Sequence, residues 1–491
     1  MVPQELIHYI MKKYLLLLLV VALSFTTAFA ADESTITIKT SKPVGTTVSL
    51  DAYTASKDEA FTVDWGDGEE KIYNVDPNGW GYSRRIKTEI KGGTITIKGK
   101  LVNFDLTEAG ITSVDIHGQT ALKVINLKEN EIATFKQGGM PALTELNLRD
   151  NKLTTFSGTG MTSLKTLNLQ GNQLDSHEFD ITDASATLTD LTVSNNGDKF
   201  ITLNLMAFTA LEYFYCDDNP EFTTAVFADN NANIKKISMN NCHVMHFYSC
   251  TFPNLYSLNL SNNALLDLEE GNYPKLSTLS IDHNYLTALD VTRFPKLESL
   301  YCGNNNITLL NVGNNPGLLS LNCDSLGITK LDISNNKDLA YLSVNGTKLT
   351  QLDIRGKRSI TTLNISNTAI RYIDLEDQYS LRDFRARNTQ CEFFYFNYIN
   401  PWGRFNYVDI RDNKKMTGNS MNFTLHTIPQ AYSDYSNSLL IAGSNGETAD
   451  TEYATSQDMK WKCDVTGDGT AKNEAVKVTV DGTDTGERVS G

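Results

Sequence analysis

A pattern of leucines around a single asparagine recurs along this chain every 21 residues, and no other feature constrains the fold as strongly. Residues 279–291 read LSIDHNYLTALDV, and the same frame returns as LYCGNNNITLLNV from Leu300. It begins again at Leu321, Leu342 and Leu363. A short, fixed period predicts a solenoid, in which each copy forms one coil and buries its apolar residues against neighbouring coils.

The first apolar residue of each copy, which we call the anchor, marks fifteen coils over residues 101–418. Three spacings of 24, 23 and 23 residues, around Leu191, Phe214 and Ile237, interrupt the regular array, and the last spacing, from Phe384 to Val408, is 24 residues. The anchors are Phe104, Ile125, Leu146, Leu167, Leu191, Phe214, Ile237, Leu258, Leu279, Leu300, Leu321, Leu342, Leu363, Phe384 and Val408.

The residue two places after each anchor is apolar or small, and we expect it to point inward from a short strand. Cys216, Cys302 and Cys323 occupy this column, which predicts small buried thiols. Adjacent coils would place Cys302 and Cys323 about 4.8 Å apart, but the side-chain vectors would be poor for a disulfide. Cys391 is also expected at a core position.

The residue five places after the anchor is usually asparagine, and its amide is expected to satisfy backbone groups at a tight turn. Cys242 replaces this asparagine in one coil. The asparagines of the column are Asn130, Asn151, Asn172, Asn196, Asn219, Asn263, Asn284, Asn305 and Asn413.

A second strand is predicted in each coil, for example at 114–116, 289–291, 331–333, 352–354 and 373–375. The middle residue of each of these segments is aspartate. Such a stripe of outward carboxylates would suit cations or a basic partner, or each carboxylate would accept a hydrogen bond within its own turn. We favour the second interpretation.

The array resembles bacterial leucine-rich repeat proteins of the 21-residue class, and more broadly the internalin-type surface proteins. The resemblance covers about two-thirds of the sequence. It implies a right-handed superhelix of about fifteen coils of 21–24 residues. The chain departs from internalins in repeat length, module order and the lack of a cell-wall anchor, so their host receptors are not carried over.

Residues 1–30 are expected to be an export signal, with Met11-Lys12-Lys13 before an apolar run and Ala28-Phe29-Ala30 as the cleavage site. Residues 31–100 alternate with period two and predict a small β-sandwich. The turn VDWGDG (63–68) resembles that of PKD and immunoglobulin-like domains. Its two aspartates, Asp64 and Asp67, are expected to cap the turn rather than bind a cation.

Residues 419–465 leave the repeat frame and predict an α/β cap over the open end of the solenoid. Residues 466–491 form a polar tail, which the composition makes a candidate for disorder. The segment Asp464–Gly469 resembles a dockerin calcium loop. Thr466 and Ala475 stand where calcium ligands belong, so we favour a glycine-rich turn.

The formal net charge of −15 argues against nucleic acid and against an anionic membrane surface as partners. No second hydrophobic span follows the signal. No catalytic motif is present, so the chain is expected not to be an enzyme and to need no cofactor. His243 and His246 with Cys242 and Cys250 suggest zinc, but Cys242 already has a place in the asparagine column, so no metal site is predicted.

The residues flanking the anchors are expected to form an exposed sheet face for a ligand. Tyrosine gives a large contact area at low entropic cost, and it stands there among Asn, Ser and Thr. The sequence favours an exported bacterial protein, secreted or at the cell surface, that binds an extracellular protein or acts in adhesion. A carbohydrate-binding accessory protein and a structural surface component are the alternatives. The candidate ligand-binding residues are Tyr213, Tyr215, Asp217, Asp282, Tyr301, Asp324 and Tyr341.

Overall fold

The chain forms two compact units, Met1–Lys199 and Phe200–Gly491. The predicted export signal, the predicted calcium-like loop and most of the predicted cap lie outside the residues that the structure describes. No helix among the described residues is long and apolar enough to cross a membrane. The computed structural model describes residues 34–56, 58–73, 86–248, 250–396, 407–416, 424, 427, 437–441 and 476–480.

The first unit begins with antiparallel strands, and alternate residues are buried in β1, β2, β3 and β6, as the period-two pattern predicts. Asp64 accepts hydrogen bonds from the backbone N–H groups of Gly66 and Gly68 (2.8 and 3.0 Å), which confirms its role as a turn cap. The strands are β1 (Thr35–Thr40), β2 (Thr47–Tyr53), β3 (Phe61–Asp64), β4 (Glu70–Tyr73), β5 (Ile86–Glu89) and β6 (Thr94–Lys98).

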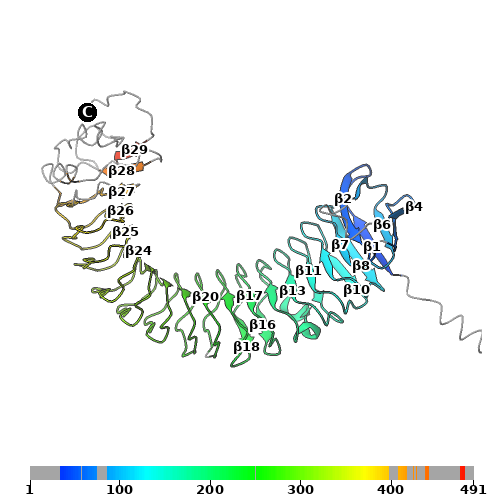
Figure 1. Cartoon of the computed structure of the whole chain (residues 1–491), viewed down its shortest axis with the longest axis horizontal. Coiled ribbons are helices and arrows are strands. Elements are labelled where there is room, and N and C mark those ends of the chain that lie inside the picture. The colour runs from blue at the N-terminus through cyan, green and yellow to red at the C-terminus, as the bar shows by residue number, and fades with distance from the viewer. Residues whose placement is uncertain are drawn as a thin grey trace, which may run out of the picture. The chain divides into compact units, whose positions relative to one another are not determined.

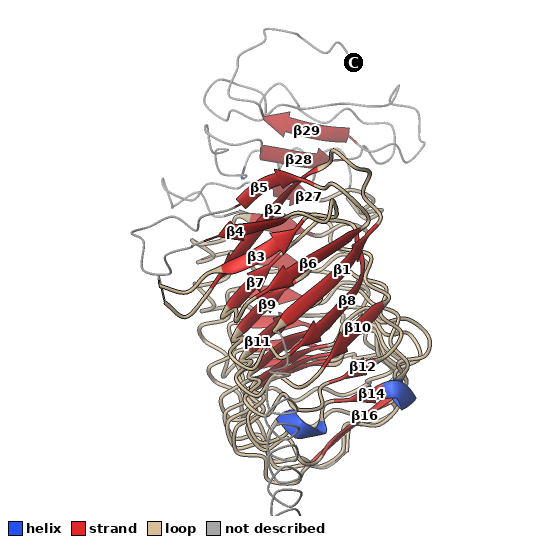
Figure 2. Ribbon diagram, turned by 90° about the vertical axis from the view of Figure 1, so that its right-hand side faces the viewer, coloured by secondary structure: helices blue, strands red, loops and turns tan. Residues whose placement is uncertain are grey.

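These N-terminal strands are hydrogen-bonded to the first coils of the same unit. One sheet has the strand order β10-β8-β1-β6-β3-β4, in which β10 is Thr134–Gln137 and β1 pairs antiparallel with β8 (Ile111–His117) (Figure 2). β2 likewise pairs with β7 (Asn103–Asp105), the strand of the first anchor. The domain boundary at residue 100 and the PKD-type sandwich stay predictions. Backbone hydrogen bonds join strands before residue 100 to strands after it.

The remaining strands of the first unit belong to its coils. Parallel pairs join β8 to β10, β12 to β14, and the anchor strands to one another. These elements are β9 (Val124–Asn126), β10 (Thr134–Gln137), β11 (Glu145–Asn147), β12 (Phe156–Ser157), β13 (Thr166–Asn168), the 3-10 helix η1 (Ser176–Glu178), β14 (Phe179–Asp180), the 3-10 helix η2 (Thr182–Ala184) and β15 (Asp190–Thr192).

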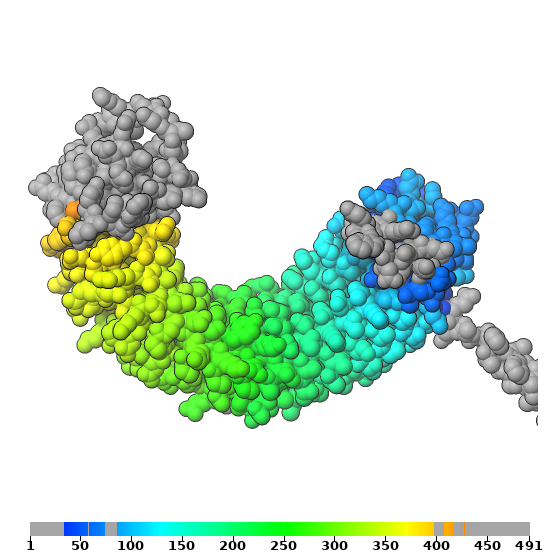
Figure 3. Space-filling view, in the orientation of Figure 1, coloured from blue at the N-terminus to red at the C-terminus, as the bar shows by residue number. Residues whose placement is uncertain are grey.

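The second unit continues the array, and its anchor strands run parallel and in register from β17 to β27 (Figure 1). The space-filling view shows its successive coils packed directly against one another (Figure 3). The strands are β16 (Thr202–Leu205), β17 (Tyr213–Tyr215), β18 (Thr224–Phe227), β19 (Lys236–Ser238), β20 (Ser257–Asn259), β21 (Thr278–Ser280), β22 (Ser299–Tyr301), β23 (Ser320–Asn322), β24 (Tyr341–Ser343), β25 (Thr362–Asn364), β26 (Asp383–Arg385), β27 (Tyr407–Asp409), β28 (Asn437–Ile441) and β29 (Val476–Val480).

All fifteen predicted anchors are confirmed as the middle residues of three-residue strands. Each anchor side chain is at most 1% exposed, because its neighbours in the adjacent coils cover it. Cys216, Cys302, Cys323 and Cys391 are buried, and the six cysteines described are free thiols, as expected. Burial raises the pKa of the Cys323 thiol well above its ordinary value.

The asparagine column is a structural ladder, as predicted. The Asn284 amide nitrogen donates to the carbonyl oxygens of Leu260 (2.9 Å) and Ile281 (3.0 Å), and its oxygen accepts from the Leu265 N–H (2.9 Å). The residue before it, His283, has a φ of 54°, and the equivalent residue of every anchor coil has a positive φ. Where the column holds asparagine, its amide therefore supports the left-handed turn by pairing with the backbone groups around it.

The prediction of a second strand in every coil is wrong for much of the second unit. The segment 114–116 lies within β8, but 289–291, 331–333, 352–354 and 373–375 are not strands, although their apolar residues are largely buried. In each of these segments the central aspartate accepts a hydrogen bond from the N–H two residues on (2.9–3.0 Å). This local turn competes with strand pairing, and it confirms the favoured interpretation of the aspartate stripe.

The residue fifteen places after the anchor is aromatic in three successive coils of the second unit and polar in the four coils that follow. Tyr273 stacks between Phe252 and Phe294, with ring centroids 5.8 Å from each neighbour. Its hydroxyl is buried without a hydrogen-bond partner among the described residues. The same column then continues as buried Asn315, Asn336, Lys357 and Gln378, which donate to carbonyl oxygens of the preceding coils.

Beyond the last anchor, β28 pairs in parallel with β27 and antiparallel with β29. β28 lies within residues 419–465, where an α/β cap is predicted. β29 lies within the predicted polar tail, where the composition had not indicated a strand. The boundaries of cap and tail at residues 418 and 465 stay predictions.

Candidate binding face

All seven predicted ligand-binding residues lie in the second unit, beside its anchor strands. We define the sheet face as the residues directly before and after the anchors in β17 and β19–β27. Tyr213 and Tyr341 precede their anchors, and Tyr215 and Tyr301 follow theirs. Asp217, Asp282 and Asp324 stand two residues further on. Each of the seven is half-buried.

The sheet face is best organised at β17. Tyr213 and Tyr215 flank the buried anchor Phe214 and project on the same side of the strand. The Lys235 ammonium lies 5.8 Å from the Tyr213 ring centroid, and it also binds the Glu212 carboxylate (2.6 Å). The Lys236 ammonium lies 5.1 Å from the Tyr215 ring centroid. These cation–π contacts restrain two long side chains and two rings on one surface.

The three aspartates connect neighbouring coils. Asp217 accepts hydrogen bonds from the Ser238 hydroxyl (2.6 Å) and the Asn240 N–H (2.7 Å). Asp324 repeats this geometry with Ser343 and Asn345 (2.5 and 2.8 Å), and burial raises the pKa of its carboxyl.

Asp282 accepts from the Ser261 hydroxyl of the preceding coil (2.7 Å) and pairs with the His283 ring (2.9 Å). The carboxylates of all three aspartates are thus engaged within the solenoid. A role for them in binding a partner stays a prediction.

The structure does not bring the four tyrosines together. Tyr215 and Tyr301 share a column but lie four strands apart, about 19 Å at the usual strand spacing. Tyr213 and Tyr341 share the other column and lie six strands apart, about 29 Å. Burial and the Asp324 carboxylate raise the pKa of Tyr341. Only a ligand that extends along several coils would contact all of them.

Sequence reasoning missed a charged cluster at the other end of the face, on β26 and β27. The Arg385 guanidinium binds both oxygens of Asp383 (3.0 and 2.9 Å) and lies 4.9 Å from the Tyr407 ring centroid. Arg411 forms the same paired contact with Asp409 (2.8 and 2.6 Å). The sequence indicates both pairs through the spacing Asp-x-Arg, which places the two side chains on one side of an extended chain.

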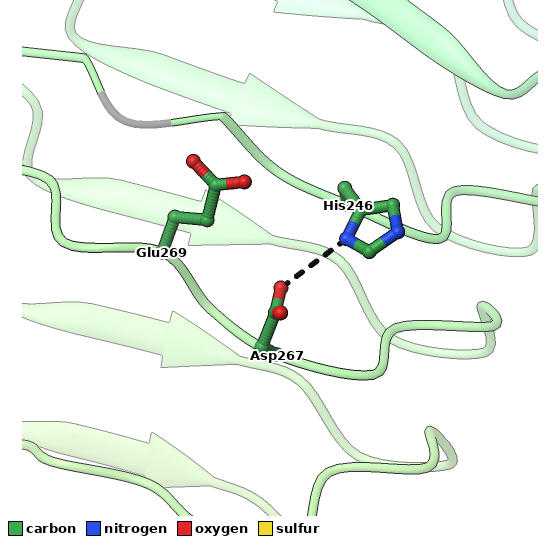
Figure 4. A group of neighbouring side chains, drawn as sticks. All are labelled: His246, Asp267 and Glu269. Atoms are coloured by element: carbon green, nitrogen blue, oxygen red, sulfur yellow. Dashed lines mark hydrogen bonds and ion pairs between the residues drawn. The ribbon is translucent and has the colours of Figure 1, made fainter.

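A second group lies in the other half of the coils, away from the anchor strands. Figure 4 shows His246, Asp267 and Glu269, whose potential ligand atoms lie within 4.8 Å of one another. Cys242 is not part of this group: as expected from its place in the asparagine column, its thiol donates to the Cys216 carbonyl oxygen (3.2 Å). The sequence indicates the group of His246, Asp267 and Glu269 through one spacing: His246 and Asp267 are separated by one repeat, which places them on adjacent coils.

A cavity of about 370 Å³ opens beside this group. His246 lines it together with Phe227, Phe247 and Cys250. Burial first, and then the carboxylates of Asp229 and Glu269, raise the pKa of the Cys250 thiol. The cavity lies within the irregular coils, beside β18. β18 pairs in parallel with β16, and it is the last paired second strand among the described residues.

Comparisons with known proteins agree with this architecture. Residues 134–174 match the leucine rich repeat family. The solved structure of the functional domain of InlJ from Listeria monocytogenes, described as including a cysteine ladder, shares 21% identity with a TM-score of 0.56. The match covers 81% of this chain and 88% of that one. The chain has a leucine-rich repeat fold.

A second solved structure, the internalin InlF from Listeria monocytogenes, shares 21% identity over 57% of this chain and 84% of that one, with a TM-score of 0.44. No curated protein matches the chain. The predicted fold class, a β-rich leucine-rich repeat solenoid, is confirmed. At these identities the likeness establishes the fold, and the function has to be argued from the residues of this chain.

Proposed function

We propose that this chain is an exported, non-enzymatic bacterial protein that recognises another protein with the sheet face of its second unit. The observation that supports the proposal is the restrained group on β17 and β19, in which two half-buried tyrosines lie under lysine ammonium groups. Binding energy at protein interfaces concentrates in rigid aromatic anchors of this kind.

The surroundings of this group suit a partner with an acidic segment. Lys235 is already neutralised by Glu212, whereas Lys236 contacts the Tyr215 ring. A partner carboxylate would meet the Lys236 ammonium while apolar groups cover the two rings. Ser and Asn residues on the following strands offer adaptable hydrogen bonds around this centre.

A binding screen with matched variants tests the proposal. The purified chain is probed against an array of purified secreted proteins and cell-surface ectodomains, and in parallel against a glycan array. Each hit is then measured with the Tyr213→Ala/Tyr215→Ala variant. The control is Tyr285→Ala/Tyr372→Ala, which removes two tyrosines that are 58% and 55% exposed and lie outside the sheet face.

The proposal expects a protein hit whose affinity falls by about tenfold or more in the face variant, the usual effect of losing an interface hot spot. The control variant should bind as the unaltered chain does. Equal affinity in both variants would contradict a role for this face. Hits restricted to glycans would favour the carbohydrate-binding alternative, and self-association alone in light scattering would favour a structural surface component.

A further inference from the structure

The group His246, Asp267 and Glu269 is built by the repeat register itself. His246 and Asp267 each stand nine residues after an anchor, Ile237 and Leu258. Their coils are joined by hydrogen bonds from Ala264 N–H to the Val244 carbonyl (3.1 Å) and from Leu266 N–H to the Met245 carbonyl (3.3 Å). The imidazole and the carboxylate are therefore held side by side by neighbouring backbones.

The side chains of His246, Asp267 and Glu269 point outward because their apolar neighbours in the chain are buried. Val244 and Phe247 are buried on either side of His246, and Leu265 is buried before Asp267. Glu269 follows Asp267 by two residues, and its carboxylate turns toward the other two side chains (Figure 4). The His246 and Asp267 side chains are 43% and 58% exposed, so water and ions reach them.

The spacing of the donor atoms fits a transition metal better than a plain ion pair. His246 Nδ1 and Asp267 Oδ1 are 3.4 Å apart, which is longer than the 2.7–2.9 Å of a good charge-assisted hydrogen bond. Ligand atoms about 2.0–2.2 Å from a tetrahedral zinc ion are separated by roughly 3.3–3.6 Å. The ligand atoms of all three side chains lie within 4.8 Å of one another, so Glu269 needs to approach by at most about 1.5 Å to reach this spacing.

The local charge also favours a cation. Two carboxylates of one coil lie next to each other, and the Glu269 carboxylate, with that of Asp229, also disfavours the thiolate of Cys250. A divalent ion would offset this repulsion. One imidazole with two carboxylates is a donor set for Zn²⁺ and neighbouring first-row ions, whereas Ca²⁺ and Mg²⁺ prefer oxygen ligands alone.

We propose that His246, Asp267 and Glu269 form a binding site for a divalent transition metal ion, with Zn²⁺ as the fitting example. Three protein ligands leave at least one coordination position for water or an outside ligand, as in open zinc sites. His246 also lines the neighbouring cavity, which places that cavity beside the proposed site. The site is separate from the sheet face and does not depend on the function proposed for that face.

Calorimetric titration of the full chain with ZnCl₂ tests the site. The expected result is saturable binding that His246→Gln and Asp267→Asn each weaken by more than about tenfold, a loss that even outer-shell changes cause. The matched control is His177→Gln, because His177 forms an exposed pair with Asp175 (3.0 Å) but has no third ligand in the groups found among the described residues. The control should bind as the unaltered chain does.

Cobalt substitution gives a second readout. Co²⁺ bound by the unaltered chain should show visible absorption bands from nitrogen and carboxylate ligands, and His246→Gln should change them. Thermal melts establish that each variant is folded, which the exposure of the three side chains favours. Absence of saturable Zn²⁺ binding, or binding that both variants leave unchanged, would overturn the proposal. Ca²⁺ binding that survives His246→Gln in place of Zn²⁺ would overturn it as well.

Discussion

Removal of one ladder amide is expected to open the solenoid locally. In Asn284→Ala the carbonyl oxygens of Leu260, Ile281 and Asp282 lose a donor (2.9, 3.0 and 3.2 Å), and the Leu265 N–H loses its acceptor (2.9 Å). Asn284 is only 6% exposed, so water does not replace these bonds in the folded state. At about 1 kcal/mol net for each bond, the free energy of local unfolding should fall by about 3–4 kcal/mol.

Two further variants calibrate this loss. Thr347 and Thr368 occupy the same column and keep one bond, to the carbonyl oxygen three residues earlier (2.7 Å). Asn284→Thr should therefore lose about 1 kcal/mol less than Asn284→Ala. Asn306→Ala serves as the control, because Asn306 is exposed and its amide nitrogen donates one long bond of 3.4 Å.

Hydrogen exchange measured by mass spectrometry on peptides covering residues 260–286 reports the local opening, and urea unfolding reports the wider effect. Each coil contacts only its neighbours, so the change should concentrate in those peptides. Equal exchange in Asn284→Ala and Asn306→Ala would refute the assignment of the amide as a structural element. An Asn284→Thr variant less stable than Asn284→Ala would refute the worked magnitude.

Three other changes follow from single sites. Tyr273→Phe should raise the free energy of unfolding by about 1 kcal/mol in urea titration, because the buried hydroxyl lacks a partner among the described residues; a marked loss would contradict this. The Arg355 guanidinium and N–H lower the pKa of Asp353 to about 2, so carbon-13 NMR should find this carboxyl ionised well below pH 3.8, and Arg355→Ala should raise its pKa. The stabilisation from that pair is present above the unfolded pKa and is lost as the pH falls toward 2. Burial instead raises the pKa of Asp324, so stability falls as the pH rises from the unfolded pKa of this carboxyl through the folded one. Asp324→Asn should remove this fall from a denaturation series measured across that pH range.

The repeat frame predicted the coils because its columns carry independent physical requirements. An apolar anchor and an apolar or small residue two places on recur in every coil, and an amide five places on recurs in nine of the fifteen, so Leu279, Ile281 and Asn284 were assigned to core and ladder correctly. The second strand failed at 289–291 because alternation predicts which residues are buried but not whether backbones pair. In this segment the Asp290 carboxylate accepts a hydrogen bond from the N–H two residues on, and this local turn takes the place of strand pairing.

The candidate site was predictable only in part. The position of Tyr213 and Tyr215 follows from the anchor between them, but the lysines over their rings depend on side-chain conformations in the next coil. His246 and Asp267 meet because equal register places them on adjacent coils, a relation visible only after the array has been aligned coil by coil. The sequence placed Cys242 in the asparagine column, and the hydrogen bond from its thiol to the Cys216 carbonyl oxygen confirms that position.

Footprinting of the complex tests most directly whether a partner binds the sheet face. The chain is oxidised with hydroxyl radicals alone and with a protein partner identified by the array, and tyrosine modification is quantified residue by residue. The prediction is that Tyr213 and Tyr215 become protected, while Tyr285 and Tyr372 react as in the free chain. Protection of Tyr285 or Tyr372 with Tyr213 and Tyr215 unchanged would contradict binding through the sheet face.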